Sequence, residues 1–188
     1  AISSLNSEKL KTFKNEFQID KSLSFDNYND LIKCTEIDAI YIATLNNTHL
    51  DLIKLCAENK KNILCEKPMS LNIEEAKIAA NFIKKFDVIF YEALAYTSHI
   101  QTKTFIDLIN NNEIGEILSA NATFGFKVKR VKAKSRIFNK LLGGGAILDI
   151  GCYPFSLINL IFKNDKNINF KSTKGSFAIT GVDDSAEA

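Results

Sequence analysis

Apolar runs of strand length alternate with amphipathic helical stretches in the first half of the chain, and this order constrains the fold more than any other feature. The runs lie at residues 37–45, 62–66 and 88–94, and helical patterns occupy 48–59 and 72–86 between them. Strands separated by helices of this length predict βαβ units and a parallel sheet. We therefore expect an α/β domain with a parallel sheet over residues 1–95, with the run at 37–45 buried on both faces.

The pattern changes after residue 96. A helix is expected to end at Gly115, and a long strand with rough alternation is expected over 116–128. A basic loop, a glycine-rich turn into a helix over 143–162 and a strand-like stretch over 168–181 follow. Long strands with few helices predict a second, α+β domain over residues 96–188, with an open, mainly antiparallel sheet that is incomplete.

Composition narrows the class of protein. The chain has 188 residues, of which 46% are hydrophobic and 14 are Phe, so it can bury the core of a globular protein. A formal charge of +2 predicts neither a nucleic-acid nor a membrane partner. We see no apolar run near the ~20 residues that span a bilayer and no signal-peptide pattern. The four cysteines are far apart, so we expect reduced thiols, a cytoplasmic location and no metal site.

Two short stretches carry side chains that could do chemistry. In the first, NILCEKPMS, Glu66 and Lys67 follow a predicted buried strand. A solvated lysine at a strand end is the simpler interpretation, but ligands bind at the carboxyl ends of parallel strands in open α/β sheets. In the second, LLGGGAILDIGCYPF, Asp149 and Tyr153 are four residues apart and share one helical face. A glycine hinge before a packed helix is the alternative there.

Together the two stretches resemble the glucose–fructose oxidoreductase/inositol dehydrogenase (Gfo/Idh/MocA) family of NAD(P)-dependent oxidoreductases. The order IDAIYIAT, NILCEKPMS, YEALAY and GGGAILDIGCYP runs through the whole chain. Tyr153, where many members have His, is similar to the dihydrodiol and xylose dehydrogenase subgroup. The resemblance implies a Rossmann domain and an α/β domain whose open sheet mediates oligomer contacts.

The resemblance also implies roles for individual residues. Lys67 matches the catalytic lysine, Asp149 the acidic residue that helps to hold the substrate, and Tyr153 the proton-transfer residue. Arg136 is expected to contact substrate together with these three. The expected cofactor contacts, which include the catalytic lysine, are Ser3, Ser4, Thr44, Asn46, His49, Glu66, Lys67, Glu92 and Ala93.

The cofactor loop is where the chain departs from the family. All eight glycines lie at residue 115 or later, so the G-x-G-x-x-G loop that holds a pyrophosphate is missing. Residues 1–4 would be the family's second strand, so we expect this sequence to be a fragment of a longer chain. Ser3 and Ser4 stand where an acidic residue would bind a ribose hydroxyl and favour NAD. The cofactor is thus expected to be NADP or NAD, with the serines favouring NADP.

The basic loop at 127–136 has six positive residues and no negative one. A solvated loop, an anion site for a cofactor phosphate or acidic substrate, and a nucleic-acid patch are alternatives, and the last would need interleaved aromatic residues. Arg136 is the residue of this loop that we expect to contact a ligand.

The function expected is reversible hydride transfer between nicotinamide and a secondary alcohol of a sugar, polyol or cyclic diol. Tyr153 would exchange the proton and Lys67 would stabilise its phenolate, although these roles could be exchanged. The alternative is a non-catalytic regulator or scaffold that binds the cofactor. We expect a small-molecule substrate and a homo-oligomer formed through the open sheet.

Overall fold

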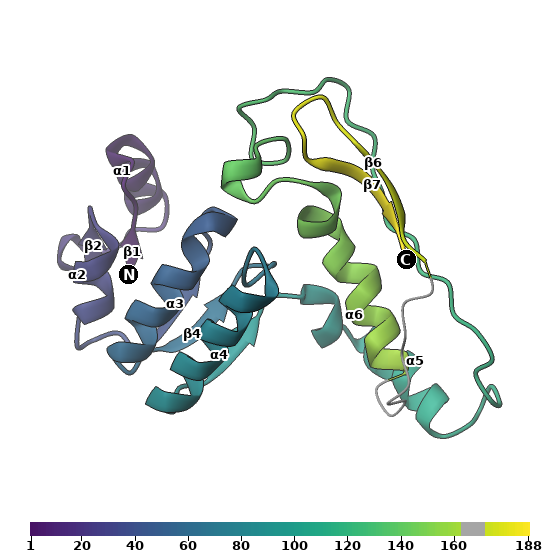
Figure 1. Cartoon of the computed structure of the whole chain (residues 1–188). Coiled ribbons are helices and arrows are strands. Elements are labelled where there is room, and N and C mark those ends of the chain that lie inside the picture. The colour runs from purple at the N-terminus through teal and green to yellow at the C-terminus, as the bar shows by residue number, and fades with distance from the viewer. Residues whose placement is uncertain (163–171) are drawn as a thin grey trace. The chain divides into compact units, whose positions relative to one another are not determined.

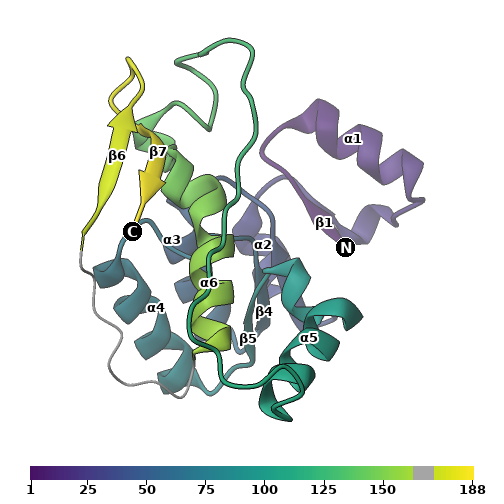
Figure 2. The same ribbon diagram turned by 90° about the vertical axis from the view of Figure 1, so that its right-hand side faces the viewer.

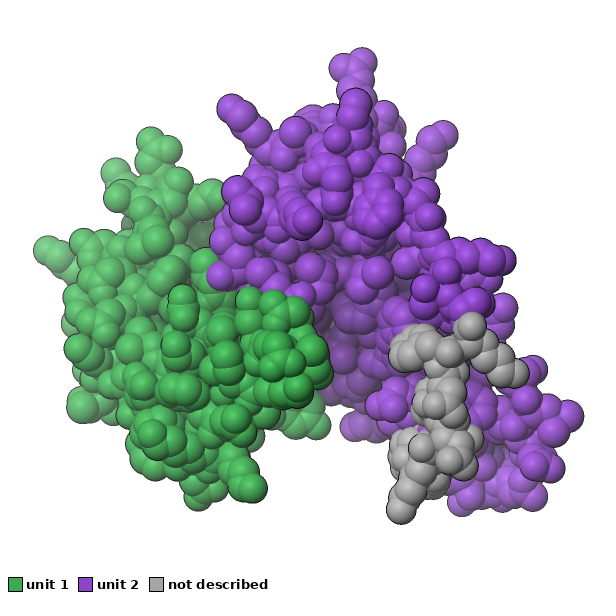
Figure 3. All heavy atoms as spheres, in the orientation of Figure 1, with its two compact units in different colours: residues 1–44, 48–66, 72–91 green, residues 45–47, 67–71, 92–188 purple. Residues whose placement is uncertain are grey.

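The computed structural model covers the whole chain and describes residues 1–162 and 172–188. Two compact units are present (Figures 1 and 3). Unit 1 comprises residues 1–44, 48–66 and 72–91, and unit 2 comprises residues 45–47, 67–71 and 92–188. Two short loops of the first half of the sequence therefore belong to unit 2. The expected boundary between residues 95 and 96 stays a prediction.

Unit 1 is built from parallel strands and helices, which confirms the Rossmann-like class. Its strands are β1 (Ile2–Ser3), β2 (Ser24–Phe25), β3 (Ala39–Ile42), β4 (Asn62–Cys65) and β5 (Phe90–Glu92), of which the last residue belongs to unit 2. Its helices are α1 (Ser7–Glu16), α2 (Tyr28–Lys33), α3 (His49–Glu58) and α4 (Ile73–Phe86). The pairs β1–β2 and β3–β4 are parallel, and β3, β4 and β5 form one sheet in that order.

The strands of unit 1 lie in two sheets. A doubly wound sheet with strand order 3-2-1-4-5-6 has its first strand in the middle. In that order β1 and β2 would be the second and third strands, and β3, β4 and β5 would be the fourth to sixth. The described residues supply no strand that pairs with both β1 and β3, so the two groups of strands form separate sheets.

The core of unit 1 lies on one face of the larger sheet. Ile40, Ile42, Ile63 and Cys65 are buried, and α3 packs against both β3 and β4. Helix α4 lies beside α3 (Figure 1). Tyr41 and Leu64, which point to the other face, are exposed. The expectation that the run at 37–45 is buried on both faces was therefore wrong, because its buried and exposed residues alternate.

The longer helical segments and the hairpin of unit 2 lie within its described residues. They are α5 (Ile100–Asn110), a π-helical turn (Ile147–Gly151) that leads directly into α6 (Cys152–Ile161), and the antiparallel strands β6 (Lys174–Phe177) and β7 (Asp183–Glu187) (Figure 2). The helix expected over 143–162 is confirmed from residue 147. The strand expected over 168–181 is present at 174–177, and its part up to residue 171 lies outside the described residues.

The long strand expected over 116–128 is wrong, since these residues have no regular secondary structure. A strand is stable only when its backbone pairs with a neighbour, and in the described residues β6 and β7 pair with each other. The open antiparallel sheet of unit 2 is correspondingly small. Alternating hydrophobicity indicated a strand, but the described residues supply no strand that pairs with 116–128.

Unit 2 contains a helical region that is long and rich in apolar residues. Lys140–Ile161 spans 22 residues and would be long and apolar enough to cross a membrane by length and composition alone. We expected no apolar run near the ~20 residues that span a bilayer, and this expectation was wrong. Core helices of soluble proteins meet the same criterion, so the finding is weak evidence for a membrane span.

Candidate active site

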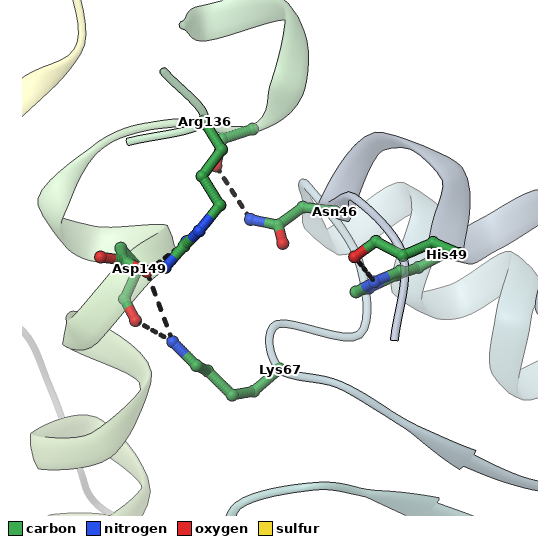
Figure 4. Close-up of polar contacts among 7 residues, drawn as sticks. Asn46, His49, Lys67, Arg136 and Asp149 are labelled. Atoms are coloured by element: carbon green, nitrogen blue, oxygen red, sulfur yellow. Dashed lines mark hydrogen bonds and ion pairs between the residues drawn. The ribbon is translucent and has the colours of Figure 1, made fainter. Parts of the chain in front are cut away.

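Lys67 reaches Asp149 within unit 2. The loop 67–71 follows β4, and the peptide bond between Lys67 and Pro68 is cis. The Lys67 Nζ atom donates a hydrogen bond to the main-chain carbonyl oxygen of Asp149 (Figure 4). The same Nζ lies 3.5 Å from Asp149 Oδ1. Two residues 82 positions apart are thus brought into contact.

Asp149 is a buried carboxylate shared by two cations. The residue is only 6% exposed, and its Oδ1 accepts a hydrogen bond from Arg136 Nη1 at 2.7 Å. A carboxylate removed from water is costly unless it is paired. The short contact to Arg136 is a charge-assisted hydrogen bond, whereas Lys67 acts on the carboxylate at longer range. Asp149 also lies in the first turn of the helical segment, where the helix dipole favours a negative charge.

Tyr153 forms the third side of this cluster. The Lys67 Nζ atom lies 5.2 Å from the centroid of its ring, within the range of a cation–π interaction. Phe124 packs edge-on against Tyr153 at 5.2 Å between centroids, and Tyr96 lies at 6.1 Å. The sequence analysis did not select Phe124 or Tyr96, because no spacing rule connects them to Tyr153. Together these rings fix the tyrosine beside the lysine.

Each glycine of the Gly143–Gly145 run allows one close approach between segments of unit 2. A Cβ on Gly143 would lie 2.3 Å from the Leu71 side chain and 3.0 Å from Asn46. At Gly144 it would lie 2.7 Å from the Arg136 carbonyl oxygen, and at Gly145 2.1 Å from an oxygen of Asp183. The glycines therefore bring the chain that bears Asp149 against the segments that bear Lys67 and Arg136. The glycines do precede a packed helix, as the alternative interpretation expected. The close packing that they allow also brings the candidate site residues together.

The expected cofactor residues in unit 1 lie near the carboxyl ends of its strands. Ser3 Oγ, at the end of β1, is buried and has no hydrogen-bond partner, whereas Ser4 Oγ accepts from the Asn6 backbone N–H. Thr44 Oγ1 lies 2.6 Å from Thr48 Oγ1 after β3. His49 is fully buried, and its Nε2 lies 3.3 Å from the carbonyl oxygen of Thr44. The histidine thus holds the turn after β3.

The remaining expected cofactor residues also have defined positions. Glu66, at the end of β4 in unit 1, accepts a hydrogen bond from the hydroxyl of Tyr41 at 2.6 Å. In unit 2, Asn46 Nδ2 donates to the carbonyl oxygen of Gly143 at 3.0 Å. Glu92 accepts from the backbone N–H of Met69, and Ala93 follows it in the chain. Glu92 therefore holds the loop that begins with the catalytic-lysine candidate.

A nicotinamide dinucleotide fits part of this set. The unpartnered Ser3 hydroxyl leaves a hydrogen-bonding group that a ribose or phosphate oxygen would satisfy. Thr44 and Glu66 supply a hydroxyl and a carboxylate at neighbouring strand ends, where such ligands bind. Residues 1–114 contain no glycine, so they offer no glycine-rich loop for the pyrophosphate. The residues present thus fit a ribose of the cofactor.

The cysteines near the two motifs are packing groups. Cys65 is buried, and burial raises the pKa of the Cys152 thiol while Lys67 partly opposes this shift. A raised pKa disfavours the thiolate that a nucleophile needs. Among the described residues, no group of three or more His, Cys, Asp and Glu side chains could hold a metal ion. The expected lack of a metal site stays a prediction.

A cavity of about 270 Å³ lies beside this cluster in unit 2. Its walls include Phe126, Val128 and Ile150, and Asp149 reaches it. Neither Lys67 nor Tyr153 lines the cavity, so it does not enclose the whole cluster.

The fold and the cluster define the class: a Rossmann-type α/β unit joined to an α+β unit that carries a lysine, an aspartate and a tyrosine in contact. Residues 1–94 match the oxidoreductase family with an NAD-binding Rossmann fold, GFO_IDH_MocA, and residues 102–188 match the GFO/IDH/MocA C-terminal domain. The chain belongs to this family.

Two relatives of the chain are named as dehydrogenases. It is 33% identical over 98% of its length to the trans-1,2-dihydrobenzene-1,2-diol dehydrogenase of Xenopus tropicalis, and 28% identical over 73% to D-xylose 1-dehydrogenase (NADP(+)) 2 of Haloferax volcanii. These matches cover 54% and 42% of the two relatives, so the chain spans about half their length.

Among solved structures, the chain resembles KijD10, a 3-ketoreductase from Actinomadura kijaniata, in an open conformation with TDP-benzene and NADP. The TM-score is 0.70 at 26% identity, with 86% of this chain and 46% of that chain covered.

Replacing the shared carboxylate tests the cluster as a structural unit. Asp149→Ala leaves Lys67 and Arg136 without their common partner, and Arg136 is half-exposed, which limits the loss. We expect the free energy of unfolding to fall by about 1–3 kcal/mol, measured by urea denaturation. Asp107→Ala, at an exposed position of α5, is the control and should change it by less than about 0.5 kcal/mol. Equal effects of the two substitutions would contradict the role assigned to Asp149.

The contact between Tyr41 and Glu66 predicts an unusual tyrosine titration. The hydrogen bond to Glu66, followed by burial, raises the pKa of Tyr41 to about 12. Because the tyrosinate would face a carboxylate, Glu66→Gln should bring this pKa back toward about 10. Tyrosinate absorbance at 295 nm, recorded after stopped-flow pH jumps, measures the tyrosine titration before the chain unfolds. The part of the signal that is lost in Tyr41→Phe belongs to Tyr41. An unchanged titration in Glu66→Gln would show that the hydrogen bond does not set this pKa.

Proposed function

We propose that this chain carries the reaction site of an NAD(P)-dependent oxidoreductase that acts on a secondary alcohol of a sugar, polyol or cyclic diol. The observation that carries the proposal is the position of the Lys67 ammonium group. It contacts Asp149 and lies over the ring of Tyr153, all within unit 2. A lysine that only ended a strand would have no need of a buried carboxylate and an aromatic ring.

The cofactor supplies the hydride acceptor for oxidation and the hydride donor for reduction. Ser3, Ser4, Thr44, His49 and Glu66 of unit 1 are proposed to hold it directly or through the turns they form. Asn46, Lys67, Glu92 and Ala93 of unit 2 are the other proposed contacts. The buried Ser3 hydroxyl without a partner is the observation that supports this set best.

The side chains of the cluster handle the proton. In oxidation, the substrate hydroxyl gives its proton to the Tyr153 oxygen as the carbinol carbon loses hydride, and in reduction the proton returns. A phenol in water titrates near pH 10, so Tyr153 needs a positive charge nearby to exchange a proton at neutral pH. Lys67 brings that charge and an N–H donor for the substrate oxygen. The exchanged assignment, with Lys67 as the proton-transfer group, uses the same contacts.

Asp149 and Arg136 are proposed to orient the lysine and the substrate. Asp149 holds Lys67 through both its carbonyl oxygen and its carboxylate. Arg136 pairs with the same carboxylate, and its side chain is 53% exposed, so part of the guanidinium remains available to a substrate oxygen. The cluster of two cations and one carboxylate has a net charge of +1, which favours an alkoxide-like oxygen over a cationic group.

The preferred cofactor is proposed to be NADP. Ser3 and Ser4 are neutral, and an acidic residue at this strand end would repel a ribose 2′-phosphate. The Haloferax volcanii relative is named as an NADP(+) enzyme, and KijD10 was solved with NADP. The names of the relatives support a diol or a sugar as the substrate class.

The protein is further proposed to be a cytoplasmic homo-oligomer. All four cysteines are free, which suits a reducing compartment. Phe177 and Ile179 of the β6–β7 hairpin are exposed, and such side chains are typical of a surface that another chain covers.

Cofactor binding and turnover test the proposal together. The 188-residue chain is titrated with NADPH and NADH while nicotinamide fluorescence is followed, and we expect the tighter binding with NADPH. Turnover is then measured with NADP(+) and either trans-1,2-dihydrobenzene-1,2-diol or D-xylose. Tyr153→Phe should lower kcat by about 100-fold or more, as expected for loss of an acid–base group. Tyr28→Phe in α2 is the matched control and should leave kcat unchanged.

Three results would count against the proposal. Full turnover by Tyr153→Phe would exclude this residue as the proton-transfer group. Binding of NADPH without turnover of any alcohol would favour the alternative of a non-catalytic regulator or scaffold. Absence of binding up to millimolar NADPH would show that residues 1–188 do not hold the cofactor by themselves.

A further inference from the structure

The segment that bears Asp149 and Tyr153 begins without a cap of its own. The first backbone N–H groups of a helix have no partner within the helix and need an acceptor from elsewhere. Ala146 occupies the N-cap position of the π-helical turn and forms no side-chain cap hydrogen bond. Gly151, which precedes α6, has helical backbone angles and lies inside the same continuous segment, so the open end is the one at Ala146. The acceptor for these N–H groups must therefore come from water or from another part of unit 2.

Asp183 provides that acceptor. It is the first residue of β7, and its Oδ2 accepts a hydrogen bond from the backbone N–H of Ile147 at 2.6 Å. Its carboxylate also places a negative charge at the positive end of the helical segment. The two residues are 36 positions apart, so this is a tertiary contact and not a local cap.

The surroundings hold Asp183 against this end. Gly145 has φ of +120°, a conformation that favours glycine, and a Cβ there would lie 2.1 Å from Asp183 Oδ1. The neighbouring Val182 is buried, and Asp183 pairs with Phe177 in the β6–β7 ladder. The carboxylate is thus fixed from its own strand and from the glycine turn that it faces.

The capped turn is the one that holds the lysine. Asp149 lies two residues after Ile147, and both its carbonyl oxygen and its carboxylate contact Lys67. A shift of this turn moves both acceptors of the ammonium group at once. Tyr153 follows one turn later on the same segment.

We propose that Asp183 is a positioning residue of the Lys67–Asp149–Tyr153 cluster, acting through its hydrogen bond to the Ile147 backbone. The role in turnover rests on the proposed function, whereas the effect on Lys67 does not. Without the Asp183 carboxylate, the first turn of the segment loosens and Lys67 is no longer held at Asp149.

Chemical labelling of lysines tests the proposal without cofactor or substrate. The chain is treated with trinitrobenzenesulfonate, and the rate at each lysine is read by mass spectrometry. Asp183→Ala should raise the rate at Lys67 by about fivefold, as expected for a local opening. Asp183→Asn, which keeps an acceptor oxygen in place, should restore the slow rate. Glu187→Ala, an exposed carboxylate on the same strand, should leave the rate unchanged.

Lys61 is the internal control for general unfolding. It is 8% exposed, lies in unit 1 and donates to the main-chain carbonyls of Cys34 and Ile37. Its rate should stay the same in every variant. An unchanged rate at Lys67 in Asp183→Ala, or an equal rise at Lys61, would overturn the proposal. If Asp183→Ala does not fold, Gly145→Ala disturbs the same contact and should raise the Lys67 rate, and an unchanged rate there would likewise overturn it.

Turnover separates this proposal from the proposed function. Asp183→Ala should lower kcat by about tenfold, a typical result of misplaced reacting groups, with KM for the alcohol within about twofold. Asp183→Asn should recover most of the loss. A wild-type chain that turns over no alcohol, together with faster labelling of Lys67 in Asp183→Ala, would overturn the proposed function and keep the positioning role. Normal labelling and normal kcat in Asp183→Ala would overturn the positioning role and keep the proposed function.

Discussion

The buried carboxylate of Asp149 is the interaction on which the candidate site depends. A charge that is 6% exposed requires partners, and Arg136 and Lys67 supply them from two other segments of the chain. Once the carboxylate holds these cations, the ammonium group of Lys67 is fixed over the ring of Tyr153. A single electrostatic requirement thereby gathers the three groups that the proposed proton transfer needs. The burial of the same charge explains why removal of Asp149 would affect stability as well as chemistry.

The glycine run makes this gathering possible. Gly143, Gly144 and Gly145 each face a different segment, and a methyl group at any of them would meet a neighbour at 2.7 Å or less. Each of those segments carries Lys67, Arg136 or Asp183, or lies next to one of these residues. The glycines are therefore needed for packing between parts of the protein, which is one of two uses that glycine-rich sequences have. Close approach to a ligand is the other use, and nothing in the contacts of these three positions requires it.

Local patterns predicted the parts of the fold that depend on local interactions. The βαβ order, the parallel pairing of β3 with β4 and the helix from residue 147 are all confirmed. The prediction of a strand over 116–128 was wrong, because strand pairing depends on a partner that the local sequence does not reveal. The expected burial of both faces of β3 was wrong for a similar reason: an apolar strand is covered only where a helix packs on it, and α3 covers one face.

The sequence by itself determined the family, the alternation of strands and helices, and the residue types of the site, because these lie in short motifs such as EKP and GGGAILDIGCYP. Only the tertiary structure decided which groups meet. It showed that Lys67 donates to the carbonyl oxygen of Asp149 as well as facing its carboxylate, that Arg136 takes the same carboxylate oxygen, and that Asp183 caps the turn between them. These contacts join residues 13 to 82 positions apart. No periodicity encodes them, because they follow from the need of a buried charge and of a helix end for partners that the local sequence does not supply.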